Sequence, residues 1–214
     1  MKDFPPHLKE HILGRLLNNV YEGDERQFTS AQRNSIHIIN NQLYRHKVLR
    51  VNYTTYDLRR AQDSLNPRTQ ADVMVLAHED ESENPHPYWY AQIIGVFHVM
   101  VRHTGSESRS TAPQHIEFLW VHWLGCDLTY QAGWAAKRLP HIGFLDHDDP
   151  SAFGFLDPLH VIRGMHLIPG FAHGTSQQIP SDSPARQTSD DIEDWNCFYV
   201  NMCVINQGCR HNTH

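Results

Sequence analysis

The chain has 214 residues, of which 40% are hydrophobic and 20% are charged, a composition typical of a globular protein with one large domain or two small ones. Its net charge of -6 is unevenly divided, because residues 1–60 hold 10 Lys/Arg against 6 Asp/Glu and residues 61–214 hold 8 against 18. The acidic larger part argues against extensive wrapping around nucleic acid, so any contact with a polyanion is expected near the N-terminus.

The first predicted element is a short amphipathic helix at about residues 6–18. Leu8, Ile12, Leu13 and Leu16 recur at helical spacing, and Pro5 and Pro6 stand where a helix can begin. The polar, glycine-containing stretch that follows, residues 21–30, is predicted to be a loop.

Three β segments are predicted next. Residues 35–44 resemble a hairpin around Asn40-Asn41, although their apolar spacing also suits a helix. Residues 48–56 alternate β-branched and aromatic side chains with polar ones, which favours a strand. Residues 72–77 form a short apolar strand, and a polar acidic connection follows them.

The centre of the chain is predicted to be a strand pair at about residues 88–103 and 115–124. The intervening segment, residues 104–114, is rich in Ser and Thr and is expected to form a long hairpin loop. Frequent Gly and Pro from Gly125 onward leave room only for short strands, of which residues 197–201 form the last.

Strands joined by irregular connections, with no intervening long helices, predict a mainly β (α+β) fold. We expect a small antiparallel, barrel-like β domain with an N-terminal helix and an irregular C-terminal extension. The predicted division of the chain is an N-terminal helical segment at 1–34, a β domain at 35–174, a flexible polar loop at 175–194, and a final strand with an atypical tail at 195–214.

The chain holds four cysteines, without a leader-like start or a membrane-spanning apolar run of about 18 residues. We therefore expect an intracellular protein that makes no membrane contact. The glycine-rich phosphate loop, the Gly-x-Ser-x-Gly elbow and the His-Glu-x-x-His pair are all absent from the sequence, which lowers the expectation of an enzyme.

Two sets of residues carry metal-ligand chemistry. The first joins imidazoles and carboxylates in one run: His141, Asp146, His147, Asp148 and Asp149. The second lies at the C-terminus: Cys197, Cys203, Cys209, His211 and His214. A surface turn explains the first run better, because adjacent ligands do not converge on one ion without a special loop, and the second lacks a Cys-x-x-Cys spacing. Four further histidines, at positions 98, 103, 115 and 122, are not expected to share one site, because strand alternation separates them. No metal site or cofactor is predicted.

Two surfaces are candidate binding sites. A basic stretch with interleaved tyrosines could bind single-stranded nucleic acid, through Arg45, Lys47, Arg50, Tyr53, Tyr56, Arg59 and Arg60. A set of aromatic residues could line a cage or contact surface: Tyr88, Trp89, Tyr90, Trp120, Trp123 and Trp134. The competing interpretations are a charged outer strand face for the first set and a hydrophobic core for the second.

Several segments in order resemble a group of uncharacterised fungal proteins of mushroom type, associated with transposons of the Kyakuja–Dileera–Zisupton kind. The matching segments are residues 51–60, 66–69, 87–91, 118–123, 152–158, 162–164, 166–169, 194–195 and 198–201. The order of strands is also similar, more weakly, to the β domain that follows the catalytic region of plant CACTA-type transposases. Residues 202–214 depart from the fungal pattern.

The resemblance implies a non-enzymatic accessory domain of a transposon-derived protein, acting in the nucleus through contacts with protein or chromatin. No catalytic residue is carried over, because the presumed catalytic acids of such transposases lie in a separate region. Two alternatives stay open: nucleic-acid binding through the basic region from Tyr44 to Arg60, and a metal-dependent hydrolase that uses His141, His147, Asp148 and Asp149.

Overall fold

A computed structural model describes residues 4–17, 27–55, 58–77, 87–127, 129–133, 136–176 and 194–201 of the chain. Its helices are α1 (Phe4–Leu16), α2 (Ser30–Asn34), and the 3-10 helices η1 (Pro158–His160) and η2 (Phe171–His173). Its strands are β1 (Ile36–His46), β2 (Leu49–Thr54), β3 (Arg60–Leu65), β4 (Asp72–Leu76), β5 (Tyr88–His103), β6 (Gln114–Cys126), β7 (His141–Phe144), β8 (Phe153–Leu156), β9 (Val161–Gly164), β10 (Leu167–Pro169), β11 (Thr175–Ser176), β12 (Asp194–Trp195) and β13 (Phe198–Val200).

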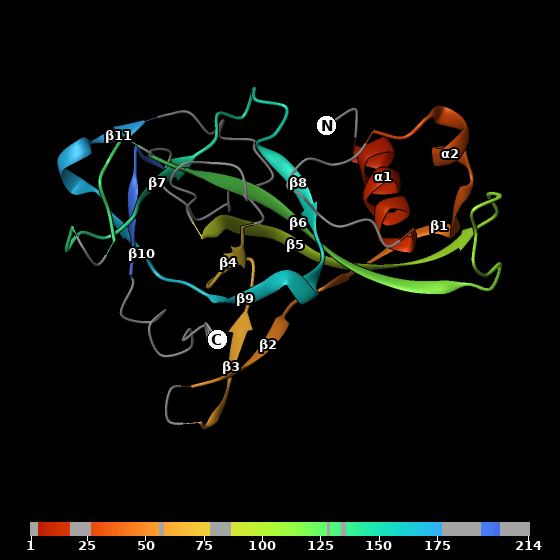
Figure 1. Cartoon of the computed structure of the whole chain (residues 1–214), viewed down its shortest axis with the longest axis horizontal. Coiled ribbons are helices and arrows are strands. Elements are labelled where there is room, and N and C mark those ends of the chain that lie inside the picture. Colours follow the sequence, from red (N-terminus) through yellow and green to blue (C-terminus); the bar gives the residue numbers. More distant parts are fainter. Residues whose placement is uncertain are drawn as a thin grey trace, which may run out of the picture.

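The long strands β5 and β6 form the centre of a nine-stranded antiparallel sheet with the order β10-β13-β7-β6-β5-β4-β9. Strand β4 pairs with the first part of β5, and β1 pairs with its last part. On β6, strand β8 pairs with residues 119–122 and β7 pairs with residues 124–126. A register shift between Ile93 and Gly95 bends β5, and the sheet curls into a half-barrel with α1 against it (Figure 1). This architecture confirms the predicted fold class.

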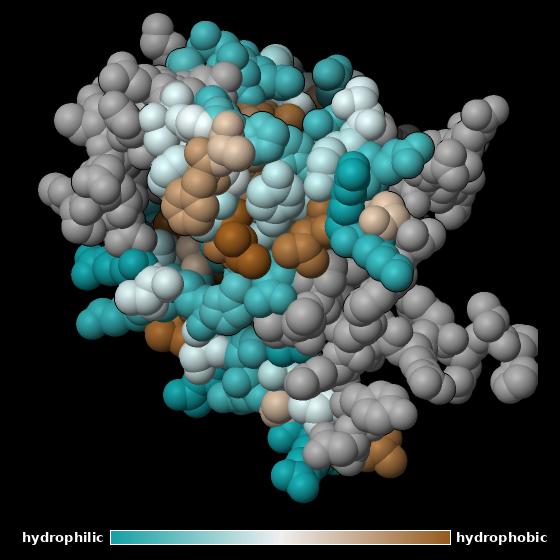
Figure 2. Space-filling model, turned by 90° about the vertical axis from the view of Figure 1, so that its left-hand side faces the viewer, coloured by the Kyte–Doolittle hydropathy of each residue, from teal (hydrophilic) through white to brown (hydrophobic). Residues whose placement is uncertain are grey.

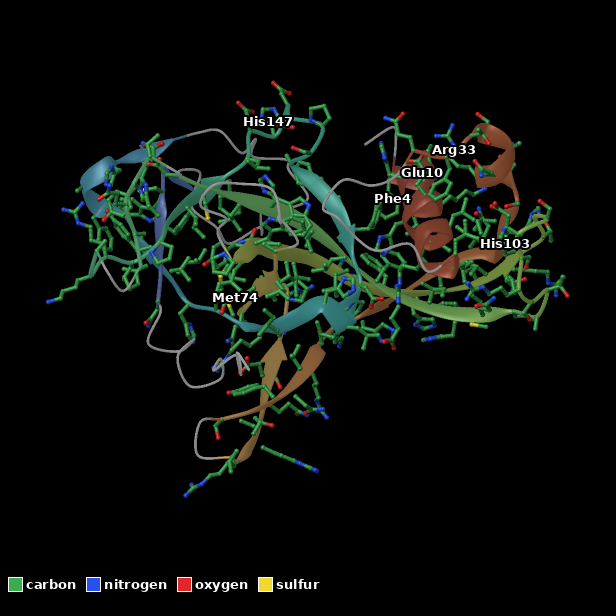
Figure 3. All side chains as sticks on the ribbon, viewed as in Figure 1. Phe4, Glu10, Arg33, Met74, His103 and His147 are labelled. Atoms are coloured by element: carbon green, nitrogen blue, oxygen red, sulfur yellow. The ribbon has the colours of Figure 1, made fainter. Side chains whose placement is uncertain are left out.

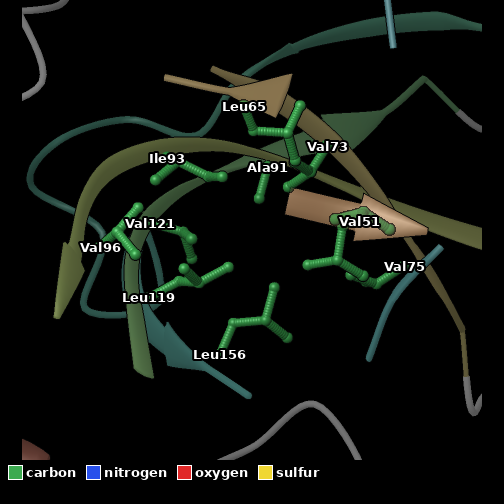
Figure 4. Close-up of a cluster of buried hydrophobic side chains, with 11 residues drawn as sticks. Val51, Leu65, Val73, Val75, Ala91, Ile93, Val96, Leu119, Val121 and Leu156 are labelled. Carbon is green, nitrogen blue, oxygen red and sulfur yellow. The ribbon is translucent and has the colours of Figure 1, made fainter. Parts of the chain in front are cut away.

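Apolar side chains pack on both faces of the central strands, in three clusters. The first, drawn in Figure 4, joins Leu119 of β6 to Leu65 of β3. The second joins Phe118 of β6 to Ile12 of α1, and the third surrounds the fully buried Tyr90. The neighbours Phe118 and Leu119 therefore face opposite sides, as strand alternation predicts. Burial of both faces explains why β5 and β6 have nearly continuous apolar sequences.

The predicted N-terminal helix is confirmed as α1. Its side chains Leu8, Ile12 and Leu13 are buried against the sheet. The short helix α2, which was not predicted, begins with a capping box in which Thr29 and Gln32 bond each other's backbone, a signal present in the sequence. Arg33 of α2 donates to the buried Glu10 carboxylate at 2.8 Å and ties the two helices together, as Figure 3 shows.

The predicted hairpin at residues 35–44 is wrong, because these residues form the single strand β1. Asn40 and Asn41 do adopt the left-handed conformation of a tight turn, with φ values of 55° and 51°. Here that conformation produces a bulge, since the register against β5 shifts between Ile38 and Leu43 while the strand continues. Pairing with β5 places Ile36, which is fully buried, in the α1 cluster.

The strands predicted at residues 48–56, 72–77, 88–103, 115–124 and 197–201 are confirmed as β2, β4, β5, β6 and β13. Strand β3 was not predicted, because its sequence of Arg, Ala, Gln, Asp, Ser and Leu has little β propensity. The short strands expected after Gly125 are present as β7 to β10. Most of the predicted polar loop at 175–194 lies outside the described residues. No helix in the described part of the chain is long and apolar enough to cross a membrane.

Candidate functional site

Strands β2 and β3 form a separate two-stranded ribbon, residues 49–65, which we call the arm. Figure 1 shows it projecting away from the main sheet. Side chains alternate along both strands, and one face is exposed along its whole length. This outer face consists of three cross-strand pairs: Arg50 with Ser64, Asn52 with Gln62, and Thr54 with Arg60. Gln62 Nε2 donates to Asn52 Oδ1 at 2.7 Å, which aligns the central pair.

The inner face of the arm is anchored to β9. The Asp63 carboxylate accepts a hydrogen bond from the Gly164 backbone N–H at 2.9 Å and lies 3.6 Å from Nε of the buried Arg163. The Arg163 guanidinium also lies over the Tyr53 ring, 4.1 Å from its centroid. Tyr53 thus packs inward and is removed from the candidate stacking surface of the outer face. Tyr56 lies outside the described residues.

The exposed charge around the arm is basic. Arg50 and Arg60 lie on the outer face, Arg59 precedes β3, Arg45 lies near the end of β1, and Lys47 follows β1; all five side chains are exposed. In the sequence from 45 to 65 these five basic residues stand against two acidic ones, Asp63, which faces inward, and Asp57, which lies outside the described residues. The arm therefore carries a local positive charge on an acidic protein.

The aromatic residues do not gather on one surface. Tyr90 is fully buried, and Tyr88 packs against the same cluster. Trp89 and Trp123 pack edge-to-face at 6.3 Å beside the cluster of Figure 4, whereas Trp120 packs in the α1 cluster on the opposite face. The described members of the set are divided among three core clusters and therefore do not line one common cage. Trp134 lies outside the described residues.

The four strand histidines do not share one site, as expected, but two of them are neighbours. His98 and His115 are neighbours on β5 and β6, with ring centroids 4.5 Å apart, and His46 Nε2 lies 2.6 Å from His98 Nδ1. Partial burial, followed by His115 and His46, lowers the pKa of His98. His103 and His122 are buried elsewhere, the latter between the rings of Phe144 and Phe153. The sequence argument missed His46, because β1 had been interpreted as a hairpin.

The predicted run of metal-type ligands divides in the structure. Asp146, His147 and Asp148 form one exposed group, in which His147 contacts both carboxylates at 3.2 Å (Figure 3). His141 instead groups with His173 and Cys197, two residues that were not considered together with it. The proposed hydrolase set is therefore not assembled. The ligand-type residues at positions 203, 209, 211 and 214 lie outside the described residues.

Asp127 supports the second group. Its carboxylate lies 3.2 Å from His141 Nδ1, and hydrogen bonds from Thr129 and His141 hold the Asp127 pKa below its usual value. Burial raises the pKa of the Cys197 thiol. This group combines an imidazole oriented by a carboxylate with a thiol, a second imidazole and partial access to solvent.

Comparison with known proteins identifies no relative: the chain matches none of the protein-family models, curated proteins or solved structures with which it was compared. The candidate sites therefore depend on the geometry described above.

Proposed function

We propose that this chain is a non-enzymatic accessory domain of a transposon-derived protein, that it contacts chromatin in the nucleus, and that DNA is the component it touches. The association with transposons rests on the resemblance of the sequence segments. The observation that carries DNA contact is the outer face of the arm, where arginine, amide and hydroxyl side chains form three exposed cross-strand pairs.

A two-stranded antiparallel ribbon fits the major groove of B-DNA. Arginine can pair with guanine and with phosphates, and Asn or Gln can pair with adenine through two hydrogen bonds. The pairs Arg50–Ser64, Asn52–Gln62 and Thr54–Arg60 present these groups on one side of the ribbon. The body of the protein repels phosphates, since residues 61–214 hold 8 Lys/Arg against 18 Asp/Glu. We therefore expect the contact with DNA to be confined to the arm and to Arg45 and Lys47 at the end of β1.

Replacing Arg50, Arg59 and Arg60 together by Gln is expected to weaken binding to a duplex by on the order of 100-fold at about 0.1 M salt. Loss of three phosphate contacts should also reduce the slope of log affinity against log salt by about 2.7. Fluorescence anisotropy with a labelled duplex over a salt series measures both quantities.

The matched control replaces three exposed arginines outside the arm, Arg102, Arg109 and Arg138, by Gln. It removes the same charge and should leave the affinity within a few-fold of the wild-type value. An equal loss of affinity in both triple variants would show that the duplex does not bind at one particular surface. An unchanged affinity of the arm variant would exclude the arm as the binding surface. Failure of the wild-type protein to bind duplex at low salt would leave a protein component of chromatin as the contact.

A further inference from the structure

Three segments that are distant in the sequence converge at one end of the sheet. His141 begins β7, His173 ends η2, and Cys197 directly precedes β13. One ligand atom from each of these side chains lies within 4.8 Å of the other two. We propose that His141, His173 and Cys197 bind a zinc ion.

The residue types suit zinc, which takes imidazole nitrogen and thiolate sulfur ligands in tetrahedral geometry. With ordinary bond lengths, ligand atoms around such an ion stand about 3.3 to 3.7 Å apart. The three side chains therefore need to move inward by at most about an ångström. His173 is exposed and can make this adjustment by rotation, whereas Cys197 is only 5% exposed. Three protein ligands leave the fourth position to water or to an added ligand.

Hydrogen bonds orient both histidines, and for His141 they select the nitrogen that faces the ion. His141 Nδ1 is turned to the Asp127 carboxylate at 3.2 Å, so Nε2 points the other way. That Nε2 atom is buried and makes no hydrogen bond within the described part of the structure. His173 Nε2 lies 3.2 Å from the Tyr199 hydroxyl, which holds this ring beside the His141 ring, with the two centroids 5.0 Å apart. Outer partners of this kind, a carboxylate above all, orient metal-bound histidines and increase their basicity.

Hydrogen bonds and strand pairing hold the three ligand-bearing segments together independently of an ion. The Gly170 N–H donates to the Cys197 carbonyl at 2.9 Å, and Asn196 Nδ2 donates to the His173 carbonyl at 2.7 Å. A Cβ at Gly170 would lie 2.4 Å from Cys197 Sγ, so glycine is needed for the loop to approach the thiol. Strand pairing of Tyr199 with His141 fixes β13 beside β7.

The site is accessible from one end of the molecule. In Figure 1, η2 and β10 lie at the left-hand end, which faces the viewer in Figure 2. That end has a small apolar area framed by hydrophilic side chains, and Phe171 and Ile168 are exposed there. His173 is itself exposed, so an ion can reach it without unfolding of the domain.

Metal titration of the purified full chain after treatment with a chelator tests the proposal. Cobalt(II) is expected to bind in a 1:1 ratio and to give a thiolate-to-cobalt charge-transfer band together with tetrahedral visible bands. Zinc should displace it and abolish both signals. Binding should release the Cys197 thiol proton, which is detected as a dependence of the calorimetric heat on the buffer.

Variants locate the site. Cys197→Ser should abolish the charge-transfer band, and His173→Gln, at an exposed position that does not endanger folding, should weaken zinc binding by at least about 100-fold. Asp127→Asn should weaken it by about 10- to 100-fold while the band is retained. The controls His147→Gln and the double change C203S/C209S should bind as the wild type does. Wild-type binding by His173→Gln, loss of binding in either control, or absence of 1:1 cobalt binding would overturn the assignment.

Discussion

Replacing Asp63 by Ala is expected to lower the free energy of unfolding by about 3 kcal/mol, because the change removes the carboxylate beside a buried guanidinium. Arg163 is 6% exposed, and its Nε lies 3.6 Å from Asp63 Oδ2. The same carboxylate accepts the hydrogen bond from the Gly164 N–H. Urea unfolding followed by tryptophan fluorescence measures the loss.

The double variant D63L/R163M provides the first control. Removing both charges and filling the space with apolar side chains should recover part of the loss, since a buried ion pair contributes little net stability over an apolar pair. The part that comes from the Gly164 N–H bond is not recovered, because leucine offers no acceptor. Ser64→Ala, at the adjacent exposed position, should change the stability by less than about 0.5 kcal/mol. A stability of Asp63→Ala equal to that of Ser64→Ala would show that the arm is held by other contacts.

The wild-type protein should lose about 2 kcal/mol more stability between pH 7 and pH 5 than a His11→Leu variant. Burial, followed by the nearby Arg15 and His160, lowers the pKa of His11 from 6.5 to about 3. The native state thus keeps this imidazole neutral, while the unfolded chain binds a proton below its own pKa of 6.5. Stability is lost as the pH falls through the interval from about 6.5 to about 3, and the difference between the two proteins should approach about 4 kcal/mol near pH 3.

A comparison of two proteins is necessary because Asp72 acts in the opposite direction. Burial raises the pKa of this carboxyl from 3.8 to about 6, so the native state retains a proton that the unfolded chain releases, and stability falls as the pH rises through that interval. Both proteins contain Asp72, so its effect cancels in the difference. His166→Gln, at an exposed position, should follow the wild-type pH profile. Parallel profiles of stability against pH for His11→Leu and the wild type would mean that His11 binds its proton as readily in the native state as in the unfolded chain.

Local sequence patterns were sufficient for the main β elements. Each of these patterns lies within a single strand or helix and follows the periodicity of that element. Examples are the apolar runs of β5 and β6, the alternation that places Phe118 and Leu119 on opposite faces, and the helical spacing in α1. The Asn40-Asn41 prediction failed because a left-handed pair fits both a hairpin turn and a bulge. The alternative that forms is decided by pairing with Val99 and Val101 of β5, which lie more than fifty residues further along the chain.

For the candidate sites, too, some features follow from the sequence and others depend on the tertiary structure. The sequence by itself determined the basic composition of the arm and the acidic body, because charge is additive along a chain. Only the tertiary structure decided that Tyr53 packs inward on Arg163, that the aromatic residues enter three separate cores, and that His141 meets His173 and Cys197. These outcomes depend on strand pairing between remote segments, which sets the face and the neighbours of each side chain. Spacing within a single segment carries no information about such pairing.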